Sequence, residues 1–443
     1  MALSGLDIYK LLPKTNCRKC GFPTCLAFAM QLAKKAVDLS KCPEITKEAR
    51  AALESSAQPP IKLITVGVGE TKLEIGNENV LFRHEEKFFH PAGIGIILED
   101  SLSENELVLR VNQINKLHFE RIGQTISVNL IAIKQTGNDK GKFVNAVKKV
   151  SELTKLSLVL YSSDAESIKS SLEIVSKRKP LIYAADKNSY KELAKIAKEF
   201  SSPLAIKEEN LEKLSELSQA IISEGASELI LDSGDKPINK KIWDLTQIRR
   251  LALRKNYRPF GYPTIAVVRK RETYEQVIEA CIYVLKYAGI VLLEGFSPYQ
   301  ILPLLTLRQN IYSDPQKPLQ VEPKAYPIGQ VSVNSPVLIT TNFSLTYYTV
   351  LSELEASKVP SYLVSVDTEG MSVLTAWAAE KFTPEKISES LNKFEITGKV
   401  NHKQIIIPGY VAVMSGDLEE KSGFKVIVGP KEAAGIPSFL RNL

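Results

Sequence analysis

Histidine is scarce in this sequence, and long hydrophobic runs are missing. The 443 residues include only 4 His, at His84, His90, His118 and His402, and no two of them have the spacing of a metal-ligand pair or a catalytic triad. No apolar run reaches the ~18 residues that a membrane span needs. The N-terminus also lacks the apolar core and the cleavage site of a secretory signal. We therefore expect a cytoplasmic protein without a membrane segment.

Phosphate-binding and nucleic-acid-binding motifs are also missing. The segment 137–142, GNDKGK, lacks the spacing and the Ser or Thr of a P-loop. The formal net charge is +7, and Lys and Arg are spread along predicted helices rather than gathered in a block with aromatic residues. The sequence therefore predicts neither an ATP site nor a nucleic-acid partner.

Cysteine is rare over most of the chain but concentrated near its start. Four of the 5 Cys follow the pattern C-x2-C-x4-C-x16-C-P, at Cys17, Cys20, Cys25 and Cys42. Three thiolates on one tight loop and a fourth one followed by proline are typical of a [4Fe–4S] cluster. A structural zinc site is the alternative, although zinc usually favours two C-x2-C knuckles or added His, and residues 1–57 contain no His. Cys281 stands alone and is predicted to be a buried helix residue.

The pattern of apolar runs divides the chain into three segments. Proline-bearing polar stretches at 55–60 and 312–327 are candidate linkers and hinges. We expect a small [4Fe–4S] domain at 1–57, a barrel domain at 58–320 and a smaller α/β domain at 326–443. The whole chain is thus predicted to be of the α/β class.

The middle segment alternates apolar strands with helical stretches, which favours a parallel sheet covered by helices and, at this strand number, a closed (β/α)8 TIM barrel. The stretch 61–81 is expected to form a hairpin that closes the barrel bottom. Asp232 ends a predicted strand, but one carboxylate without a visible partner does not identify a catalytic site. The predicted barrel strands are 94–98, 126–132, 158–161, 181–184, 204–206, 229–231, 265–268 and 290–293.

The last segment repeats the strand–helix alternation on a smaller scale. Strands are predicted at 337–340, 362–366, 404–407 and 425–428, with helices near 345–358, 373–381 and 384–394. This pattern is typical of a Rossmann-like, doubly wound α/β domain, in which ligands bind at the carboxyl ends of the strands. The loops there are rich in hydroxyls and small residues, including the stretches 339–346 (ITTNFSLT) and 367–375 (DTEGMSVLT).

The cysteine motif, the barrel and these two C-terminal stretches together resemble the large (gamma) subunit of the corrinoid iron–sulfur protein of the reductive acetyl-CoA (Wood–Ljungdahl) pathway. The resemblance covers the whole chain in domain order. It implies a [4Fe–4S] cluster on the four Cys and a cobalamin-type corrinoid in the last domain. The corrinoid contacts that we expect are Thr340, Thr346, Gly370, Met371, Ser372, Val373 and Ala433.

The resemblance also implies the function. In that family the cob(I)amide accepts a methyl group from methyltetrahydrofolate through a separate methyltransferase and donates it from methyl-Co(III) to the nickel cluster of acetyl-CoA synthase. The protein is then a methyl carrier grouped with methyltransferases and not a stand-alone catalyst. The implied partners are a small subunit in a heterodimer, that methyltransferase, acetyl-CoA synthase/CO dehydrogenase and a reductive activator.

The corrinoid is expected to be base-off and without a histidine ligand, because the motif D-x-H-x-x-G is absent and His402 lies outside the predicted loops. Loss of the lower ligand eases reduction of Co(II) to Co(I), so the cluster is expected to reactivate Co(II). Two other functions stay open. One is a corrinoid-free, low-potential iron–sulfur electron-transfer subunit, and the other is a barrel with its own pterin methyltransferase activity.

Overall fold

Eight parallel strands close into a barrel in the computed structural model, which describes residues 5–33, 36–46, 49–50, 53, 59–269 and 272–443. Around the barrel the strands follow the order β10-β11-β12-β3-β6-β7-β8-β9. The strands are β3 (Gly93–Glu99), β6 (Leu130–Lys134), β7 (Ser157–Tyr161), β8 (Leu181–Ala185), β9 (Leu204–Lys207), β10 (Leu229–Asp232), β11 (Thr264–Val267) and β12 (Ala288–Leu293).

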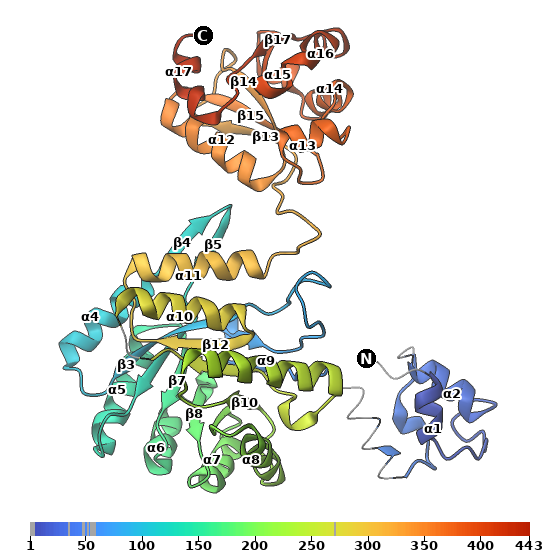
Figure 1. Ribbon diagram of the computed structural model, residues 1–443. Helices are drawn as coiled ribbons and strands as arrows, with labels where there is room; N and C mark the ends of the chain where they lie inside the picture. Colours follow the sequence, from blue (N-terminus) through green and yellow to red (C-terminus); the bar gives the residue numbers. More distant parts are fainter. Residues whose placement is uncertain (1–4, 34–35, 47–48, 51–52, 54–58, 270–271) are drawn as a thin grey trace. The chain divides into compact units, whose positions relative to one another are not determined.

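A helix follows every barrel strand, so the predicted (β/α)8 barrel is confirmed. Figure 1 shows these helices around the strands. Side-chain caps define several helix starts. Ser103 and Glu106, for example, form a reciprocal capping box at the start of α4. The helices are α4 (Glu104–Asn115), α5 (Lys140–Leu153), α6 (Ala165–Val175), α7 (Tyr190–Glu199), α8 (Leu211–Ser223), α9 (Ile238–Lys255), α10 (Thr273–Leu285) and α11 (Pro298–Ile311).

An antiparallel hairpin of β1 (Ile64–Val66) and β2 (Leu73–Ile75) fills the N-terminal end of the barrel. Its four apolar side chains join the same buried cluster as Leu130, Val159 and Leu181 inside the barrel. The approach is close, since a Cβ added to Gly93 would lie 2.3 Å from a methyl carbon of Leu73. The predicted bottom-closing hairpin is confirmed.

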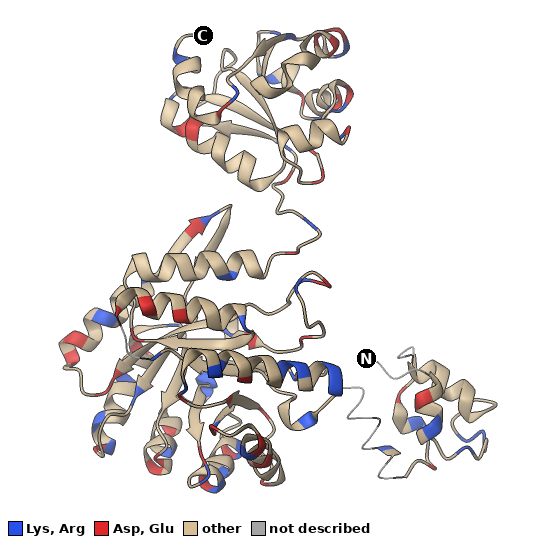
Figure 2. Ribbon diagram, in the orientation of Figure 1, with Lys and Arg blue, Asp and Glu red and all other residues tan. Residues whose placement is uncertain are grey.

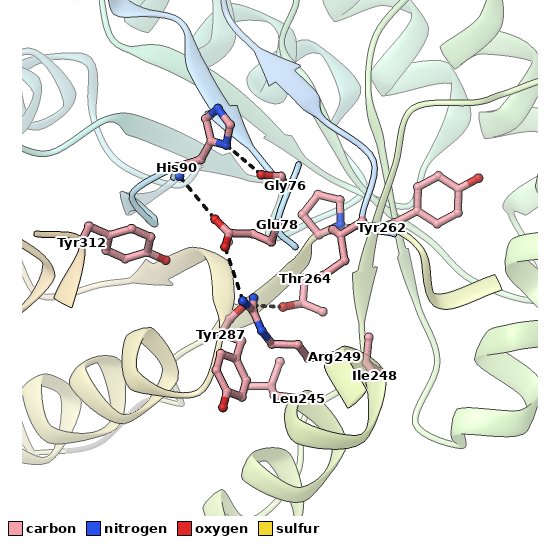
Figure 3. A pocket seen from close by; sticks show the side chains of 13 residues that line it. Gly76, Glu78, His90, Leu245, Ile248, Arg249, Tyr262, Thr264, Tyr287 and Tyr312 are labelled. Atoms are coloured by element: carbon pink, nitrogen blue, oxygen red, sulfur yellow. Dashed lines mark hydrogen bonds and ion pairs between the residues drawn. The ribbon is translucent and has the colours of Figure 1, made fainter. Parts of the chain in front are cut away.

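Beside this hairpin, a buried ion pair fixes the segment that leads into β3. Figure 3 shows the Arg249 guanidinium of α9 reaching Glu78, with a nitrogen–oxygen distance of 3.4 Å. The same guanidinium lies 4.8 Å from the ring centroid of Phe88 and 4.5 Å from that of Tyr287. The cavity that remains measures about 30 Å³, which is room for little more than one water molecule. This end of the barrel is therefore packed shut.

One strand boundary that we predicted is wrong. The apolar stretch 126–132 does not form one strand. Its start belongs to β5 (Gln124–Ser127), which pairs with β4 (His118–Arg121), and its end belongs to the barrel strand β6. Residues 119–126 group with the C-terminal unit rather than with the barrel, because the chain divides into compact units at 1–118 with 127–312 and at 119–126 with 313–443.

The C-terminal unit has a five-stranded sheet in the order β13-β15-β14-β16-β17. The four predicted strands are present and mutually parallel, whereas β13, which we did not predict, is an antiparallel edge strand. Along the parallel part the strand order is 2-1-3-4. Successive strands are therefore added on one side of β14 first and then on its other side, beginning with β16, and the strand order reverses between β14 and β16. The strands are β13 (Ala325–Ile328), β14 (Val337–Thr341), β15 (Ser361–Val366), β16 (Gln404–Ile407) and β17 (Lys425–Val428).

Helices cover both faces of this sheet. Buried side chains of α12 and α17 pack on Leu338, Leu363 and Ile406, and those of α13, α14 and α16 pack on the opposite face. The predicted linker residues after Tyr312 lead directly into the unit, where Val321 N donates to Asn342 O at 2.9 Å. The helices are α12 (Ser344–Ser357), α13 (Val373–Ala378), α14 (Pro384–Lys393), α15 (Ile396–Lys399), α16 (Ser415–Ser422) and α17 (Ile436–Arg441).

The N-terminal segment is small and mostly loop. Helix α1 (Gly5–Leu11) packs against α2 (Cys25–Ala33), and both contribute to a cluster that also contains Cys42. Most of the predicted linker at 55–60 lies outside the described residues. None of the helices in the described part of the chain is long and apolar enough to cross a bilayer.

Candidate functional site

The four N-terminal cysteines lie in one neighbourhood. Cys25 opens α2 and is buried, as is Cys42, whereas Cys17 is exposed and Cys20 is half-buried, and all four are free thiols. Burial raises the pKa of the Cys42 thiol, and the nearby charges of the other three cysteines raise it further. Among the described residues no three ligand side chains are already gathered in metal-binding geometry. The loop therefore brings the thiols together without closing them into a ready site.

Backbone N–H groups point at three of the four sulfurs. Asn16 N donates to Cys25 Sγ at 3.4 Å, and its side-chain oxygen in turn accepts from Cys25 N at 2.8 Å. A hydrogen bond from the Lys19 backbone lowers the pKa of Cys17, and the Glu44 backbone donates to Cys42. Such bonds stabilise thiolate charge and are one of the means by which proteins tune iron–sulfur clusters. The donor set of four thiols fits a [4Fe–4S] cluster.

The C-terminal unit contains a hollow of about 370 Å³ at the carboxyl ends of β14 and β16, where the strand order reverses. Open α/β sheets bind their ligands at this point. The lining is mainly aliphatic and no histidine occurs among its described residues. It includes Ile339 and Ile407 from the strands, Leu345 and Val350 from α12, and Tyr410 and Pro430 from the loops.

Five of the seven expected corrinoid contacts line this hollow, namely Thr340, Thr346, Ser372, Val373 and Ala433. Gly370 and Met371 do not. Gly370 has φ +76°, and a Cβ there would lie 2.7 Å from the Gln320 side chain, whereas Met371 packs on the core cluster of the sheet. These two residues shape the loop instead of lining the hollow.

Asn342 holds that loop in place, a role that we did not predict. Its Oδ1 accepts from the backbone N–H groups of Thr368 and Gly370, each at 3.0 Å, and from the Thr368 hydroxyl at 3.0 Å. Asn342 is 1% exposed. An asparagine two residues after a predicted strand end was the available signal, since this residue type often hydrogen-bonds nearby backbone in turns.

The Thr340 hydroxyl is an orphan at the base of the hollow. Thr340 is 1% exposed, and its Oγ1 has no hydrogen-bond partner in the described part of the chain. A buried hydroxyl without a partner costs about 1–3 kcal/mol, so a ligand that supplies an amide group would satisfy it. A large apolar macrocycle with amide side chains fits both the aliphatic walls and this hydroxyl.

His402 lies away from the hollow. Its Nε2 is 2.9 Å from Ser335 O, at the opposite end of the strands. The other three histidines, His84, His90 and His118, belong to the first unit. Within the second unit the structure thus offers no histidine near the carboxyl ends of the strands.

Comparisons with known proteins identify the families that the chain resembles. Residues 63–440 match the family described as CO dehydrogenase/acetyl-CoA synthase delta subunit, and residues 12–44 match the family described as a putative Fe-S cluster. The first segment is therefore an iron–sulfur domain. Among solved structures, dihydropteroate synthase from Thermus thermophilus is 12% identical, with a TM-score of 0.40, and the match covers 56% of this chain and 100% of that chain.

Relatives match over the full length. The corrinoid/iron-sulfur protein large subunit of Moorella thermoacetica is 48% identical over 441 residues, which is 100% of this chain and 99% of that protein. The acetyl-CoA decarbonylase/synthase complex subunit gamma of Methanothermobacter thermautotrophicus is 36% identical, over 100% of this chain and 99% of that protein. These matches confirm the resemblance that the cysteine motif and the C-terminal stretches indicated, and the chain belongs to the family of corrinoid/iron–sulfur protein large subunits.

Proposed function

We propose that this chain carries a methyl group on a corrinoid held in the C-terminal unit. When bound, the corrinoid supplies a cobalt centre that accepts and donates methyl, and the [4Fe–4S] cluster supplies low-potential electrons that restore Co(I). The donor would be methyltetrahydrofolate through a separate methyltransferase, and the acceptor the nickel cluster of acetyl-CoA synthase. The observation that carries the proposal is the aliphatic hollow at the point of strand reversal, with the orphan Thr340 hydroxyl at its base.

The residues of the hollow have separate roles in this proposal. The aliphatic side chains of β14, β16 and α12 exclude water from one face of the macrocycle. Thr340, Thr346 and Ser372 offer hydroxyls to its amides or to its nucleotide tail. Val373 and Ala433 provide apolar contact, whereas Gly370 and Met371 set the loop that positions Ser372. Because no histidine occurs among the described lining residues, they offer no imidazole to the lower face, in keeping with a base-off corrinoid.

The four cysteines have a supporting role. Cys17, Cys20, Cys25 and Cys42 would hold the cluster, with Asn16, Lys19 and Glu44 donating to its thiolates. The functional domains would then be 1–57 for the cluster, 58–320 for the barrel and 326–443 for the corrinoid. The partners would be a small subunit in a heterodimer, the methyltransferase, acetyl-CoA synthase/CO dehydrogenase and a reductive activator.

Metal analysis and absorption spectra of the anaerobically purified complex test the proposal. We expect about four irons per cobalt, since a [4Fe–4S] cluster is held by four thiolates, and Co(I) bands on strong reduction. Iron without cobalt after attempted corrinoid loading would favour the electron-transfer alternative. Zinc in place of iron would overturn the cluster. If Cys20→Ala reactivates Co(II) as well as the parent does, only the reductive role of the cluster is overturned, and the methyl-carrier proposal is unaffected.

A further inference from the structure

The C-terminal end of the barrel contrasts with its closed N-terminal end, because every strand, or one of the two residues after it, brings a polar side chain to this end. Glu99, Lys134, Tyr161 and Tyr183 lie side by side in the strand register, as do Lys207 and Asp232. All of them border a hollow of about 210 Å³. We call these eight residues the strand-end ring, which consists of Glu99, Lys134, Tyr161, Tyr183, Lys207, Asp232, Arg269 and Glu294.

The floor of this hollow is fixed by a buried network. Asp232 and Lys241 are each 2% exposed and form an ion pair at 2.5 Å, and Tyr183 donates to the second oxygen of Asp232 at 2.5 Å. Burial raises the pKa of Asp232, but the charge of Lys241, the hydrogen bonds from Lys241 and Tyr183 and the charge of Lys207 together outweigh burial and leave the pKa below its ordinary value. The carboxylate is thus ionised and fully engaged. Tyr161 is hydrogen-bonded to Tyr183 and completes the network toward the hollow.

Lys207 is the cation of the ring without a matched anion. Lys134 lies 3.8 Å from Glu99, and Arg269 lies 3.5 Å from Glu279. Within the described residues Lys207 makes no ion pair, and Asp232, the acid beside it, is already paired with Lys241. Lys207 is half-buried at the end of β9. A partly desolvated ammonium without a counter-charge is costly, so an anionic group from a ligand would be stabilised there.

A second hollow of about 670 Å³ adjoins the first one and shares Tyr161, Tyr183 and Lys207 with it. Its size is in the range of small-ligand sites. Its other walls are loops that carry hydroxyl and amide groups, from Gln135 to Asn138 after β6 and from Ser162 to Asp164 after β7. A ligand body that fits these walls is rich in hydrogen-bonding groups.

These loops are held in place before any ligand binds. Thr136 donates to Asp100 from its backbone N–H at 2.9 Å and from its hydroxyl at 2.6 Å, and Ser162 donates to Gln135 at 2.5 Å. The acids of the second hollow are also engaged, because Asp164 accepts from Ser167 N, Asp186 accepts from Ser189 N, and Glu166 forms an ion pair with Lys140 at 3.6 Å. Preorganised walls reduce the entropy that binding costs. Lys207 is therefore a cation at the junction of the two hollows for which the described residues provide no ion pair, although the carboxylates of Asp235 and Glu294 also border the first hollow.

We propose that the C-terminal mouth of the barrel binds a small, hydrogen-bonding organic anion, with its carboxylate or phosphate on the Lys207 ammonium and its body in the hollow between the loops after β6 and β7. The site is distinct from the hollow of the C-terminal unit and does not depend on the corrinoid. It would give the barrel a ligand of its own. Barrels of this class place their binding residues at this end.

Calorimetric titration of the anaerobically purified complex tests the site. The probes are citrate for carboxylates, glycerol 3-phosphate for phosphate, and glycerol as the uncharged counterpart. We expect saturable binding of at least one anion and none of glycerol. Lys207→Gln should weaken that binding at least about tenfold, the usual effect of losing a charge-assisted contact. Lys207→Arg should retain it, and Lys195→Gln, on the exposed side of α7, should leave it unchanged.

Absorption spectra and metal content serve as folding controls for each variant, and they should match the parent because both cofactor sites are elsewhere. The proposal is overturned if neither anion binds at millimolar concentration, if glycerol binds as tightly as glycerol 3-phosphate, or if Lys207→Gln binds the anions as the parent does. A preference for citrate or for glycerol 3-phosphate assigns the anionic group as carboxylate or phosphate. Loss of cobalt binding would bear on the methyl-carrier function only.

Discussion

The hollow of about 210 Å³ at the barrel strand ends and the hollow of the C-terminal unit occupy equivalent places in their sheets but have opposite linings. Both lie at the carboxyl ends of parallel strands. The barrel hollow has charged and phenolic groups that are tied together by ion pairs and hydrogen bonds, whereas the C-terminal hollow has aliphatic walls and one orphan hydroxyl. The fold thus sets where a ligand binds, and the strand-end residues set whether it is a small anion or a large, mostly apolar cofactor. In Figure 2 charged residues of both signs lie along the helices of both units.

The largest expected effect comes from filling the C-terminal hollow. Ala433→Trp places an indole against the aliphatic walls, so bound cobalt should fall from about one per chain to nearly none, as overpacking of a fitted site predicts. Iron content should stay the same. Ala434→Trp is the matched control, because Ala434 is exposed and does not line the hollow. Equal cobalt loss in both variants would contradict the proposed location.

Breaking the buried ion pair of the barrel should have the next largest effect. Asp232→Ala leaves the Lys241 ammonium buried without its partner, which should lower the free energy of unfolding by about 3–5 kcal/mol. The chain has 2 Trp, Trp243 on α9 and Trp377 in the C-terminal unit. Urea unfolding followed by fluorescence in a Trp377→Phe background therefore reports on the barrel. A change below about 1 kcal/mol, typical of an exposed pair, would show that the pair is solvated.

The same pair should make the stability of the barrel depend on acid. Because the folded pKa of Asp232 lies below its ordinary value of 3.8, its ionisation stabilises the fold fully above that pH, and the contribution is lost as pH falls through the folded pKa. Urea midpoints of the parent and of Asp232→Asn, measured from near-neutral to strongly acidic pH, should therefore converge at the acidic end. Midpoints that stay equally far apart would contradict an ionised, paired carboxylate.

The smallest effect is expected for the orphan hydroxyl. Thr340→Val removes a buried group that has no partner, so the unit without corrinoid should become more stable by about 1–3 kcal/mol, the cost of an unpaired buried hydroxyl. Corrinoid retention should nevertheless weaken about fivefold, the equivalent of one hydrogen bond of about 1 kcal/mol. Thr341→Val is the matched control, because its hydroxyl is also buried and unpaired in the described chain but does not line the hollow. Identical behaviour of the two variants would argue against a contact from Thr340.

The sequence predicted the barrel strands well because they are apolar on both faces and bounded by turns. It failed where the signal was short or polar. The hairpin β4–β5 turns at Ile122 and Gly123, both with positive φ, instead of at an Asn-Gly pair, and only two residues of the chain separate its second strand from the start of β6. Strand β13 contains Pro327, which argued against a strand and is tolerated because β13 lies at an edge.

The site residues also divide into those that the local sequence identifies and those whose partners only the fold brings close. The cysteines were identifiable because their spacing is local, and the loops of the C-terminal unit were identifiable because they follow predicted strands. Asp232 was noticed but lacked a visible partner, because Lys241 and Tyr183 reach it only through the barrel fold. Asn342, whose contacts lie 26 and 28 residues further along the chain, was missed for the same reason.

The strand-end ring has a consequence for how the barrel assembles. Strands such as β6 and β7 are buried and apolar along almost their whole length, so their side chains distinguish poorly between neighbouring alignments. A slip by one residue would turn Lys134 or Tyr161 toward the helices and would bring an isoleucine or leucine into the charged row. The polar residues at or just after the strand ends thus disfavour misaligned strands, and the strand-end ring helps to set the register, and with it the shear, of the barrel.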